Sequence, residues 1–153
     1  MVMKIYLAGA FGPSRGFKDW RDYVIKELAG RHQVIDPRYD SKQESPMEFT
    51  IDDTLASINC DLMFHYRSPG FENNGGDYEH GVRVGSHYAS ELTKPIVLVD
   101  ESQFPHPLFM ASAKRFFTTL EAGVLYLTQL ETMDNEFEAI DKTMRILMEV
   151  GKC

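Results

Sequence analysis

Short runs of apolar residues alternate with amphipathic segments along the chain, and this alternation predicts an α/β fold. The apolar runs have the length of buried strands and lack the polar alternation of half-exposed ones. They occur at residues 2–8, 32–36, 61–66, 95–100 and 123–128. Helical patterns separate them at residues 16–30, 49–59 and 77–92, a loop and a short helical turn lie within 101–114, and a further helical pattern follows the last run at residues 133–150. Such an order predicts a parallel sheet with helices on both faces.

Residues 16–30 show the clearest helical period. Trp20, Val24 and Leu28 recur at the spacing of one helix face. Gly30 is a suitable residue to end this helix, because glycine accepts the left-handed conformation found after many helix C-termini.

In a parallel α/β sheet, ligands bind in the crevice outside the carboxyl ends of the strands. Four segments follow predicted strands there, and their proline, glycine and polar content is typical of loops. They are residues 9–16, 37–49, 67–76 and 100–112. We therefore expect the functional residues in these segments and at the helix starts that follow them.

Composition limits the classes of protein to consider. With 153 residues, 43% of them hydrophobic, the chain fits one domain that spans residues 1–153. Its net charge of −7 argues against a nucleic acid polymer or an anionic membrane as partner. No apolar stretch approaches the roughly 20 residues of a membrane span. Cys60 and Cys153 form no disulfide or metal-binding pattern, so the expected location is the cytoplasm.

The first predicted strand runs into the glycine-rich sequence GAFGPSRGF, residues 9–17. Backbone N–H groups in such a turn can bind ligand oxygen atoms. Neither the GxGxxG pattern of dinucleotide-binding proteins nor the P-loop pattern is present. Ser14 and Arg15 suggest a contact with a hydroxyl or phosphate group. The alternative is that the segment is only a tight turn.

Acidic residues lie at two predicted helix starts. Asp53 begins a short helix, and Glu79 lies in the sequence GGDYEHGVRVG. Either carboxylate alone is explained by the favourable interaction of an acidic side chain with a helix N-terminus. Gly75 and Gly76, however, leave no side chains around Glu79 and would let a ring-shaped ligand approach its carboxylate.

No metal or cofactor site is indicated by the sequence. His80 and His87 lie on one predicted helix but form neither an HxxxH nor an HExxH pattern. A GxSxG nucleophile elbow and a Cys–His–Asn arrangement are also missing from the sequence. We therefore expect neither metal nor cofactor chemistry, and no serine or cysteine hydrolase.

Four ordered segments of the chain resemble the nucleoside 2-deoxyribosyltransferase family, which includes the related 2'-deoxynucleoside 5'-monophosphate N-glycosidases. They are KIYLAG, DDTLASINCD, GGDYEHGVRVG and KPIVLVD. The resemblance implies a flavodoxin-like (Rossmann-like) fold with a five-stranded parallel sheet. It also implies a homodimer or larger homo-oligomer with shared active sites. The expected partners are a small-molecule nucleoside or nucleotide and a free nucleobase.

The resemblance assigns roles to individual residues. Glu79, in an ExG context, matches the nucleophile of the family, Asp53 matches the aspartate that handles the leaving base, and Tyr6 matches a tyrosine that positions the nucleophile. Members that use free nucleosides carry an aspartate where this chain has Asn73, six residues before Glu79. A neutral residue at that position tolerates a phosphate, as in the nucleotide-cleaving relatives.

Other residues complete the expected substrate site. Asp77 could replace the missing acid, and Ser112 is a candidate contribution from a neighbouring subunit. The expected substrate-binding residues are Gly9, Phe11, Ser14, Arg15, Asn73, Gly75, Gly76, Asp77 and Ser112. The aromatic residues that could stack on a nucleobase are Phe11, Phe17, Tyr39 and Phe71. The sequence pattern does not favour one of these four residues over the others.

Two carboxyl groups that flank one glycosidic bond can act as nucleophile and acid. Glu79 would capture C1' of the sugar as a covalent intermediate, and Asp53 would protonate the departing base. Attack by a second base then gives transfer, whereas attack by water gives hydrolysis. Three functions stay open: a deoxyribosyltransferase, which is preferred, a nucleotide N-glycosidase, and a non-catalytic nucleotide-binding module.

Overall fold

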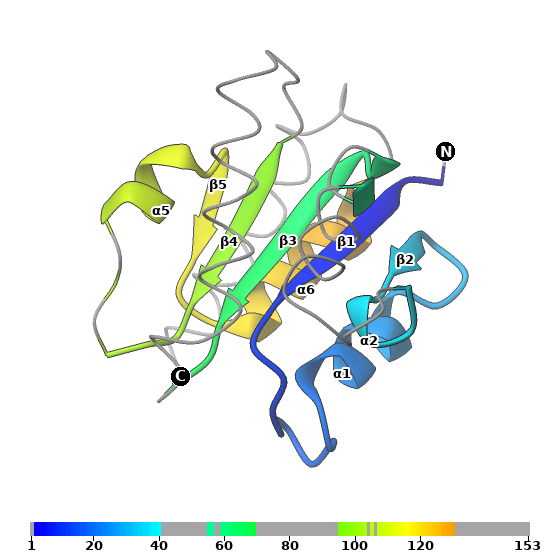
Figure 1. Cartoon of the computed structure of the whole chain (residues 1–153), viewed down its shortest axis with the longest axis horizontal. Coiled ribbons are helices and arrows are strands. Elements are labelled where there is room, and N and C mark those ends of the chain that lie inside the picture. The colour runs from blue at the N-terminus through cyan, green and yellow to red at the C-terminus, as the bar shows by residue number, and fades with distance from the viewer. Residues whose placement is uncertain are drawn as a thin grey trace.

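Five parallel strands form one sheet in the order β2-β1-β3-β4-β5 in the computed structural model (Figure 1). The structure describes residues 2–40, 55–56, 59–69, 95–103, 105 and 107–130. The strands are β1 (Lys4–Gly9), β2 (Gln33–Ile35), β3 (Leu62–Arg67), β4 (Ile96–Asp100) and β5 (Arg115–Phe117). The helices are α1 (Trp20–Leu28), α2 (Pro37–Asp40), α5 (Pro107–Ser112) and α6 (Leu120–Gln129). The predicted α/β class is confirmed, and the strand order is flavodoxin-like.

All neighbouring strands run parallel, so their carboxyl ends lie along one edge of the sheet, here called the carboxyl edge. In β1, Tyr6 pairs with Ile35 of β2 and with Met63 of β3. At the end of β3, Arg67 pairs with Asp100, the last residue of β4. The chain reverses its progress across the sheet at the β1/β3 boundary, which is where ligands bind in sheets of this order.

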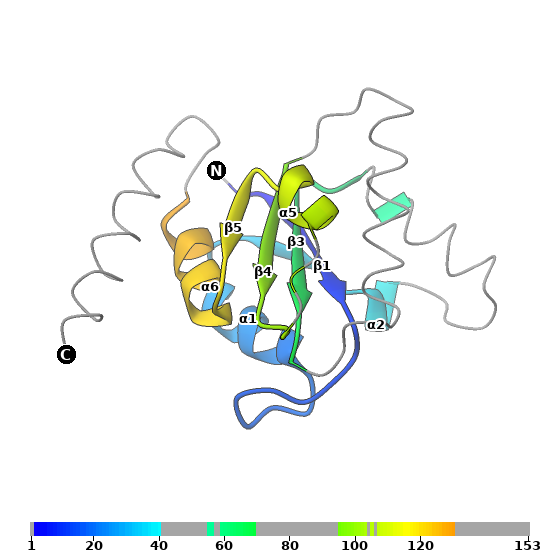
Figure 2. The same cartoon turned by 90° about the vertical axis from the view of Figure 1, so that its left-hand side faces the viewer.

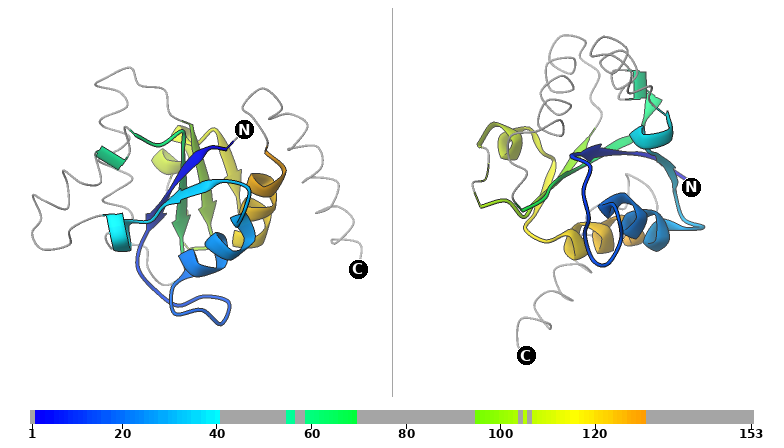
Figure 3. Two further views of the ribbon diagram at one scale, coloured as in Figure 1. Left: turned by 90° about the vertical axis from the view of Figure 1, so that its right-hand side faces the viewer. Right: turned by 60° about the horizontal axis from the view of Figure 1, so that its bottom comes forward.

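Successive residues of each strand point to opposite faces of the sheet, and each face carries its own apolar cluster. Ile5 and Leu7 of β1 belong to the larger cluster, which also contains Trp20 of α1 and residues of α6. Tyr6 and Ala8 belong to the smaller cluster on the other face. Figure 2 shows α1 and α6 on one side of the sheet and α2 and α5 on the other. The right-hand view of Figure 3 shows the same layers, so helices cover both faces as expected.

The predicted strand at residues 123–128 is wrong, because this segment belongs to α6. A continuous apolar run fits a buried helix as well as a buried strand. Here Thr119 caps a helix, and its side chain accepts a hydrogen bond from the Ala122 N–H. The residues at the spacing of one helix face are buried: Leu120, Val124 and Leu127. The place beside β4 is taken by β5.

Other predicted elements are confirmed with shifted ends. α1 begins at Trp20 rather than at residue 16, because Asp19 is its N-cap. Gly30, predicted to end this helix, follows the C-cap and has a φ of 77°. The segment 37–49, predicted as a loop, begins with the short helix α2, whose first residue is a proline with a backbone angle that suits this position.

Some predicted helices fall outside the described residues. This holds for the helices predicted at 77–92 and 133–150 and for most of the one at 49–59, of which residues 55, 56 and 59 are described and helical. Within the described part of the chain, no helix combines the length and the apolar character needed to cross a bilayer.

Gly123 lets α6 approach the sheet closely. A Cβ atom at this position would lie 2.3 Å from Cγ2 of Val99 and 3.1 Å from Cε2 of Phe64. We expect Gly123→Ala to lower the free energy of unfolding by about 2 kcal/mol, because an overlap of this size places overpacking near the upper end of its range of about 1–3 kcal/mol and the better helix propensity of alanine returns about 1 kcal/mol. Denaturant unfolding measures this loss.

A double variant tests whether Val99 is the cause. Val99→Ala removes the methyl group closest to the new Cβ. The cost of Gly123→Ala should therefore shrink in the Val99→Ala background, since two contacting residues are not additive. An equal cost in both backgrounds would show that the contact does not limit α6.

Candidate active site

Apart from Ser112 on α5, the structure places the described members of the expected site on β1 and the loop that follows it. Tyr6 is 1% exposed and lies in the smaller apolar cluster, beside Ala8 and Met63. Its ring therefore belongs to the face of the sheet opposite α1 and α6. Gly9 ends β1 at the carboxyl edge. Both residues thus lie on the strand next to the switch point between β1 and β3.

Only glycine fits at position 9, because neighbouring atoms leave no room for a Cβ atom. Its φ is 152°, and a Cβ atom there would lie 2.5 Å from the carbonyl oxygen of Tyr66 and 3.0 Å from the ring of Trp20. β1 can therefore end against β3 and α1 only with glycine at this position. This packing role exists whether or not Gly9 also contacts a substrate.

The loop from Ala10 to Lys18, here called the β1–α1 loop, folds back on itself. Ser14 and Phe17 exchange two backbone hydrogen bonds of 3.1 and 2.9 Å and so form a tight turn. The Gly12 N–H donates to the Asp19 carboxylate at 3.1 Å. These amides are already paired, so they are not the free donors expected from the glycine-rich sequence.

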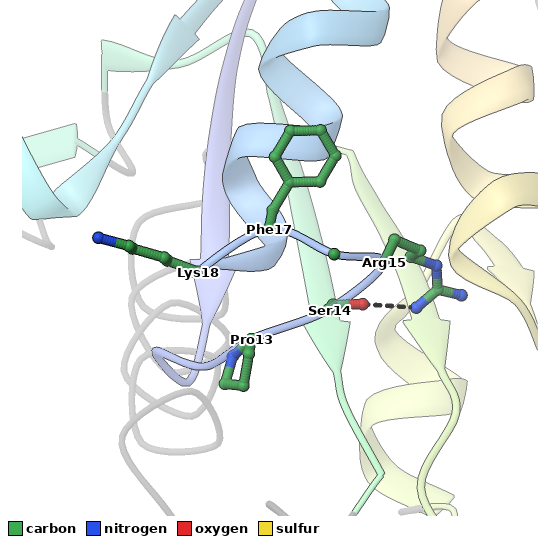
Figure 4. Close-up of a pocket in the computed structure, with 6 residues that line it drawn as sticks. Pro13, Ser14, Arg15, Phe17 and Lys18 are labelled. Atoms are coloured by element: carbon green, nitrogen blue, oxygen red, sulfur yellow. Dashed lines mark hydrogen bonds between the residues drawn. The ribbon is translucent and has the colours of Figure 1, made fainter.

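An open surface hollow of about 510 Å³ lies over the turn (Figure 4). Its lining consists of Pro13, Ser14, Arg15, Gly16, Phe17 and Lys18. The Arg15 guanidinium donates to the Ser14 hydroxyl at 2.7 Å, and Lys18 extends on the other side of the loop. The Ser14 and Arg15 side chains predicted to bind substrate therefore contact each other.

Arg15 joins the β1–α1 loop to two carboxylates from distant parts of the chain. Its guanidinium donates to Glu101 at 2.5 and 3.1 Å and to Glu121 at 2.6 and 2.8 Å. The Tyr66 hydroxyl donates to Glu101 at 2.6 Å. Pattern reasoning missed these partners, since neither glutamate belongs to a motif.

The protonation of this cluster follows from its hydrogen bonds. Burial raises the pKa of Glu101, but hydrogen bonds from Arg15, Tyr66 and the Leu120 N–H outweigh it and hold that pKa below the usual 4.5. The Arg15 hydrogen bond lowers the pKa of Glu121 as well. Burial, together with the bond to Glu101, raises the pKa of Tyr66 to about 12. The carboxylate contribution to stability is thus complete above the ordinary carboxyl pKa and is lost only as pH falls through the lowered values.

A second ionic network lies beneath the start of the β1–α1 loop. Arg21 is fully buried and donates to Asp19 at 3.2 Å, to the Leu7 carbonyl at 3.1 Å and to the Gly9 carbonyl. Arg38 of α2 lies 3.9 Å from the same Asp19 carboxylate. The network therefore ties the end of β1 to the starts of α1 and α2.

Arg38 brings further carboxylates into this network. It contacts Asp36 at 2.6 Å and Asp22 at 2.9 Å. The hydrogen bond from Arg38 is the largest cause of the lowered pKa of Asp22. These aspartates are therefore occupied as ion-pair partners of arginine.

Two aromatic rings are exposed above these arginines. Phe11 is 47% exposed and lies over the Arg21 guanidinium at 4.9 Å. Tyr39 is 79% exposed and lies over Arg38 at 5.2 Å. Phe17 instead packs on Tyr23 with a centroid distance of 6.3 Å. Of the expected stacking residues, Phe11 and Tyr39 are the described ones that offer an open ring to a planar ligand.

A further ion pair at the carboxyl edge, between β3 and β4, is buried. Arg67, the last residue of β3, donates to Asp100, the last residue of β4, at 2.7 Å. The Arg67 guanidinium also lies 5.5 Å from the ring centroid of Phe109 in α5. Asp61, in contrast, accepts a hydrogen bond from the Lys4 N–H at 2.8 Å at the other end of the sheet.

Several expected site residues lie outside the described part of the chain. They are Asp53, Asn73, Gly75, Gly76, Asp77 and Glu79. Ser112 is the last residue of α5, and only its backbone is described. Among the described residues, no group of three or more histidine, cysteine, aspartate or glutamate side chains could hold a metal ion. The catalytic and substrate-binding roles expected for the undescribed residues and for Ser112 stay predictions.

No protein-family model matches the chain, and no curated protein matches it in sequence. Solved structures do match its fold. A 2-deoxyribosyltransferase from the psychrotolerant bacterium Bacillus psychrosaccharolyticus matches with a TM-score of 0.54 and 21% identity, over 76% of this chain and 86% of that chain. A conserved protein from Enterococcus faecalis V583 matches with a TM-score of 0.56 and 16% identity, over 81% of this chain and 96% of that one. The chain therefore has the fold of a 2-deoxyribosyltransferase.

Proposed function

We propose that this chain cleaves the N-glycosidic bond of 2'-deoxynucleosides and transfers the deoxyribosyl group to another nucleobase. One observation carries the proposal: Tyr6 and Phe11 lie on and after β1, at the switch point of a sheet whose fold is shared with a 2-deoxyribosyltransferase. This is the place where a sheet of this order binds its ligand. The order of the sequence segments that resemble this family supports the same function.

In the first half-reaction, a Glu79 carboxylate oxygen attacks C1' of the sugar. The bond between C1' and the base nitrogen breaks, and its electron pair stays on the base. Asp53, in its protonated form, gives its proton to that base. The product is a deoxyribosyl ester of Glu79 and a free neutral base, as in the first step of a retaining glycosidase.

In the second half-reaction, a nitrogen of the incoming base attacks C1' from the face that the first base left. The ester bond to Glu79 breaks and returns the carboxylate. The proton lost by the incoming nitrogen goes to Asp53, which is then ready for the next turnover. Two successive displacements retain the configuration at C1'.

The described residues support this chemistry by position. We assign Tyr6 as the hydrogen-bond donor that keeps Glu79 ionised and oriented, and Phe11 as a surface on which the base stacks. Phe11 is suited to this because one face of its ring is held by Arg21 while its side chain stays half exposed. The protein is proposed to act in the cytoplasm as a homodimer or larger homo-oligomer with shared active sites.

The pairing of the described arginines at the carboxyl edge favours a nucleoside over its 5'-monophosphate. Arg15, the residue expected to bind a phosphate, is bound by Glu101 and Glu121. The other described arginines at this edge, Arg21, Arg38 and Arg67, are each paired with an aspartate. A phosphate dianion would have to displace a carboxylate to gain such a partner, whereas a 5'-hydroxyl group would not.

One chromatographic assay separates the candidate functions. The protein is incubated with a deoxynucleoside or its 5'-monophosphate, each with and without a different free base. We expect the new nucleoside only when the deoxynucleoside and the free base are both present. Release of base from the monophosphate without an acceptor would indicate a nucleotide N-glycosidase instead. Binding without any product would indicate a non-catalytic module.

A further inference from the structure

Arg15 adopts a backbone conformation that a long side chain rarely takes. Its φ is 52° and that of Gly16 is 80°. Both central residues of the turn between Ser14 and Phe17 are therefore left-handed, as in the type I′ turn, which prefers asparagine or glycine at the first position. Strain of this kind persists only where surrounding contacts hold the residue in place.

The contacts that hold Arg15 centre on Glu101. This carboxylate accepts four hydrogen bonds: two from the Arg15 guanidinium, one from the Tyr66 hydroxyl and one of 2.6 Å from the Leu120 N–H. It therefore connects the β1–α1 loop with β3 and with the first residue of α6. Glu121 also binds Arg15, but its side chain is 55% exposed, against 13% for Glu101.

Burial and connectivity make Glu101 the stronger of the two anchors. A hydrogen-bonded ion pair shielded from water is weakened less by solvent and salt than an exposed one. The Tyr66 hydroxyl and the Leu120 N–H also donate hydrogen bonds to the Glu101 carboxylate, so the orientation of this carboxylate does not depend on Arg15 alone. Glu121, on the surface of α6, loses side-chain conformational entropy when it makes the same contact with Arg15.

We propose that Glu101 is a positioning residue, which fixes the β1–α1 loop at the carboxyl edge by holding Arg15 in its left-handed conformation. The consequence for catalysis rests on the proposed function, in which Phe11 of this loop stacks on the base of the substrate. A loop held in place binds substrate without first having to be ordered. Loss of the contact should therefore weaken substrate binding and leave the chemical step at Glu79 unchanged.

Hydrogen exchange tests the structural half of the proposal without any assay of activity. In Glu101→Gln, the amides of Ser14 and Phe17 are expected to exchange at least about tenfold faster than in the wild type, because a charge-assisted hydrogen bond is lost. Glu121→Gln is the matched control, with the same chemical change at the exposed partner, and should change these rates less than about threefold. Unchanged rates in Glu101→Gln, or an equal effect of both variants, would overturn the proposal.

Steady-state kinetics test the functional half. Glu101→Gln is expected to raise KM for the deoxynucleoside about tenfold while kcat stays within about twofold. Partial unfolding would do the opposite, since it lowers the active fraction and with it the apparent kcat, while the folded molecules keep their KM. A lowered kcat with an unchanged KM would therefore overturn the positioning role.

Arg15→Gly provides a second variant should Glu101→Gln fail to fold. Glycine suits the left-handed backbone, and the substitution leaves the bonds of Glu101 to Tyr66 and Leu120 in place. We expect Arg15→Gly to raise KM as much as Glu101→Gln does. Combining the two substitutions should raise KM no further, because both changes act through one contact. Additive effects, or a wild-type KM in Arg15→Gly, would overturn the proposal.

The two proposals fail separately. If the wild type shows no turnover of any nucleoside, the proposed function fails, and the exchange rates still decide whether Glu101 holds the loop. If the wild type transfers the deoxyribosyl group but Glu101→Gln matches it in exchange and in KM, the positioning role fails alone.

Discussion

Glu79→Gln is expected to lower kcat for deoxyribosyl transfer by at least about 10⁴-fold, because it removes the nucleophile that captures C1'. Glutamine keeps the size of the side chain, but its amide can neither form the ester nor stabilise a positive charge at C1'. The measurement is base exchange between a deoxynucleoside and a free base, with products separated by chromatography.

A matched control and a mass measurement make this result specific. Glu27→Gln carries the same chemical change on the exposed surface of α1 and should keep the wild-type kcat. Wild-type protein incubated with a deoxynucleoside and no acceptor base should show a deoxyribosyl adduct in its intact mass, and Glu79→Gln should show none. Parental turnover by Glu79→Gln would remove this residue from the mechanism.

Arg21→Leu is expected to lower the free energy of unfolding by about 3 kcal/mol, the largest stability effect we foresee at the carboxyl edge. Arg21 is fully buried, and its loss leaves Asp19 and the carbonyl groups of Leu7 and Gly9 without their donor. Asp19 keeps the N–H groups of Gly12 and residue 21, which places the effect at the lower end of the range for a broken buried pair. Thermal unfolding should show a Tm about 6–12 °C lower.

Two further variants separate charge from packing in this network. Arg31→Leu changes an exposed arginine whose guanidinium donates to the Thr128 carbonyl at 3.0 Å, and should cost less than about 1 kcal/mol. Adding Asp19→Asn to Arg21→Leu removes the unpaired charge but keeps a side chain that caps α1. This double variant should recover about 1–2 kcal/mol. If it is no more stable than Arg21→Leu, the unpaired carboxylate is not the source of the loss.

Most of the sheet could be predicted because its strands are buried on both faces. β1, β3 and β4 are buried along nearly their whole length and consist mostly of apolar residues, so the composition of each short segment was sufficient evidence. The error at residues 123–128 has the same origin: α6 is also apolar on most sides, since Gly123 and its neighbours pack directly on the sheet. The composition of a short segment indicates whether the segment is buried. Core strands and core helices are both buried, so composition alone does not distinguish them.

The sequence by itself determined the fold class, the position of β1 and its glycine-rich loop, and the candidate residues Tyr6, Gly9, Phe11, Ser14 and Arg15. Only the tertiary structure decided what these residues touch. Arg15 meets Glu101 and Glu121 across 86 and 106 residues of chain, and no local pattern reports a pairing at that separation. The physical reason is that secondary structure follows from the periodicity of nearby residues, whereas the partners of a charge are chosen by which strand ends the parallel sheet brings to one edge.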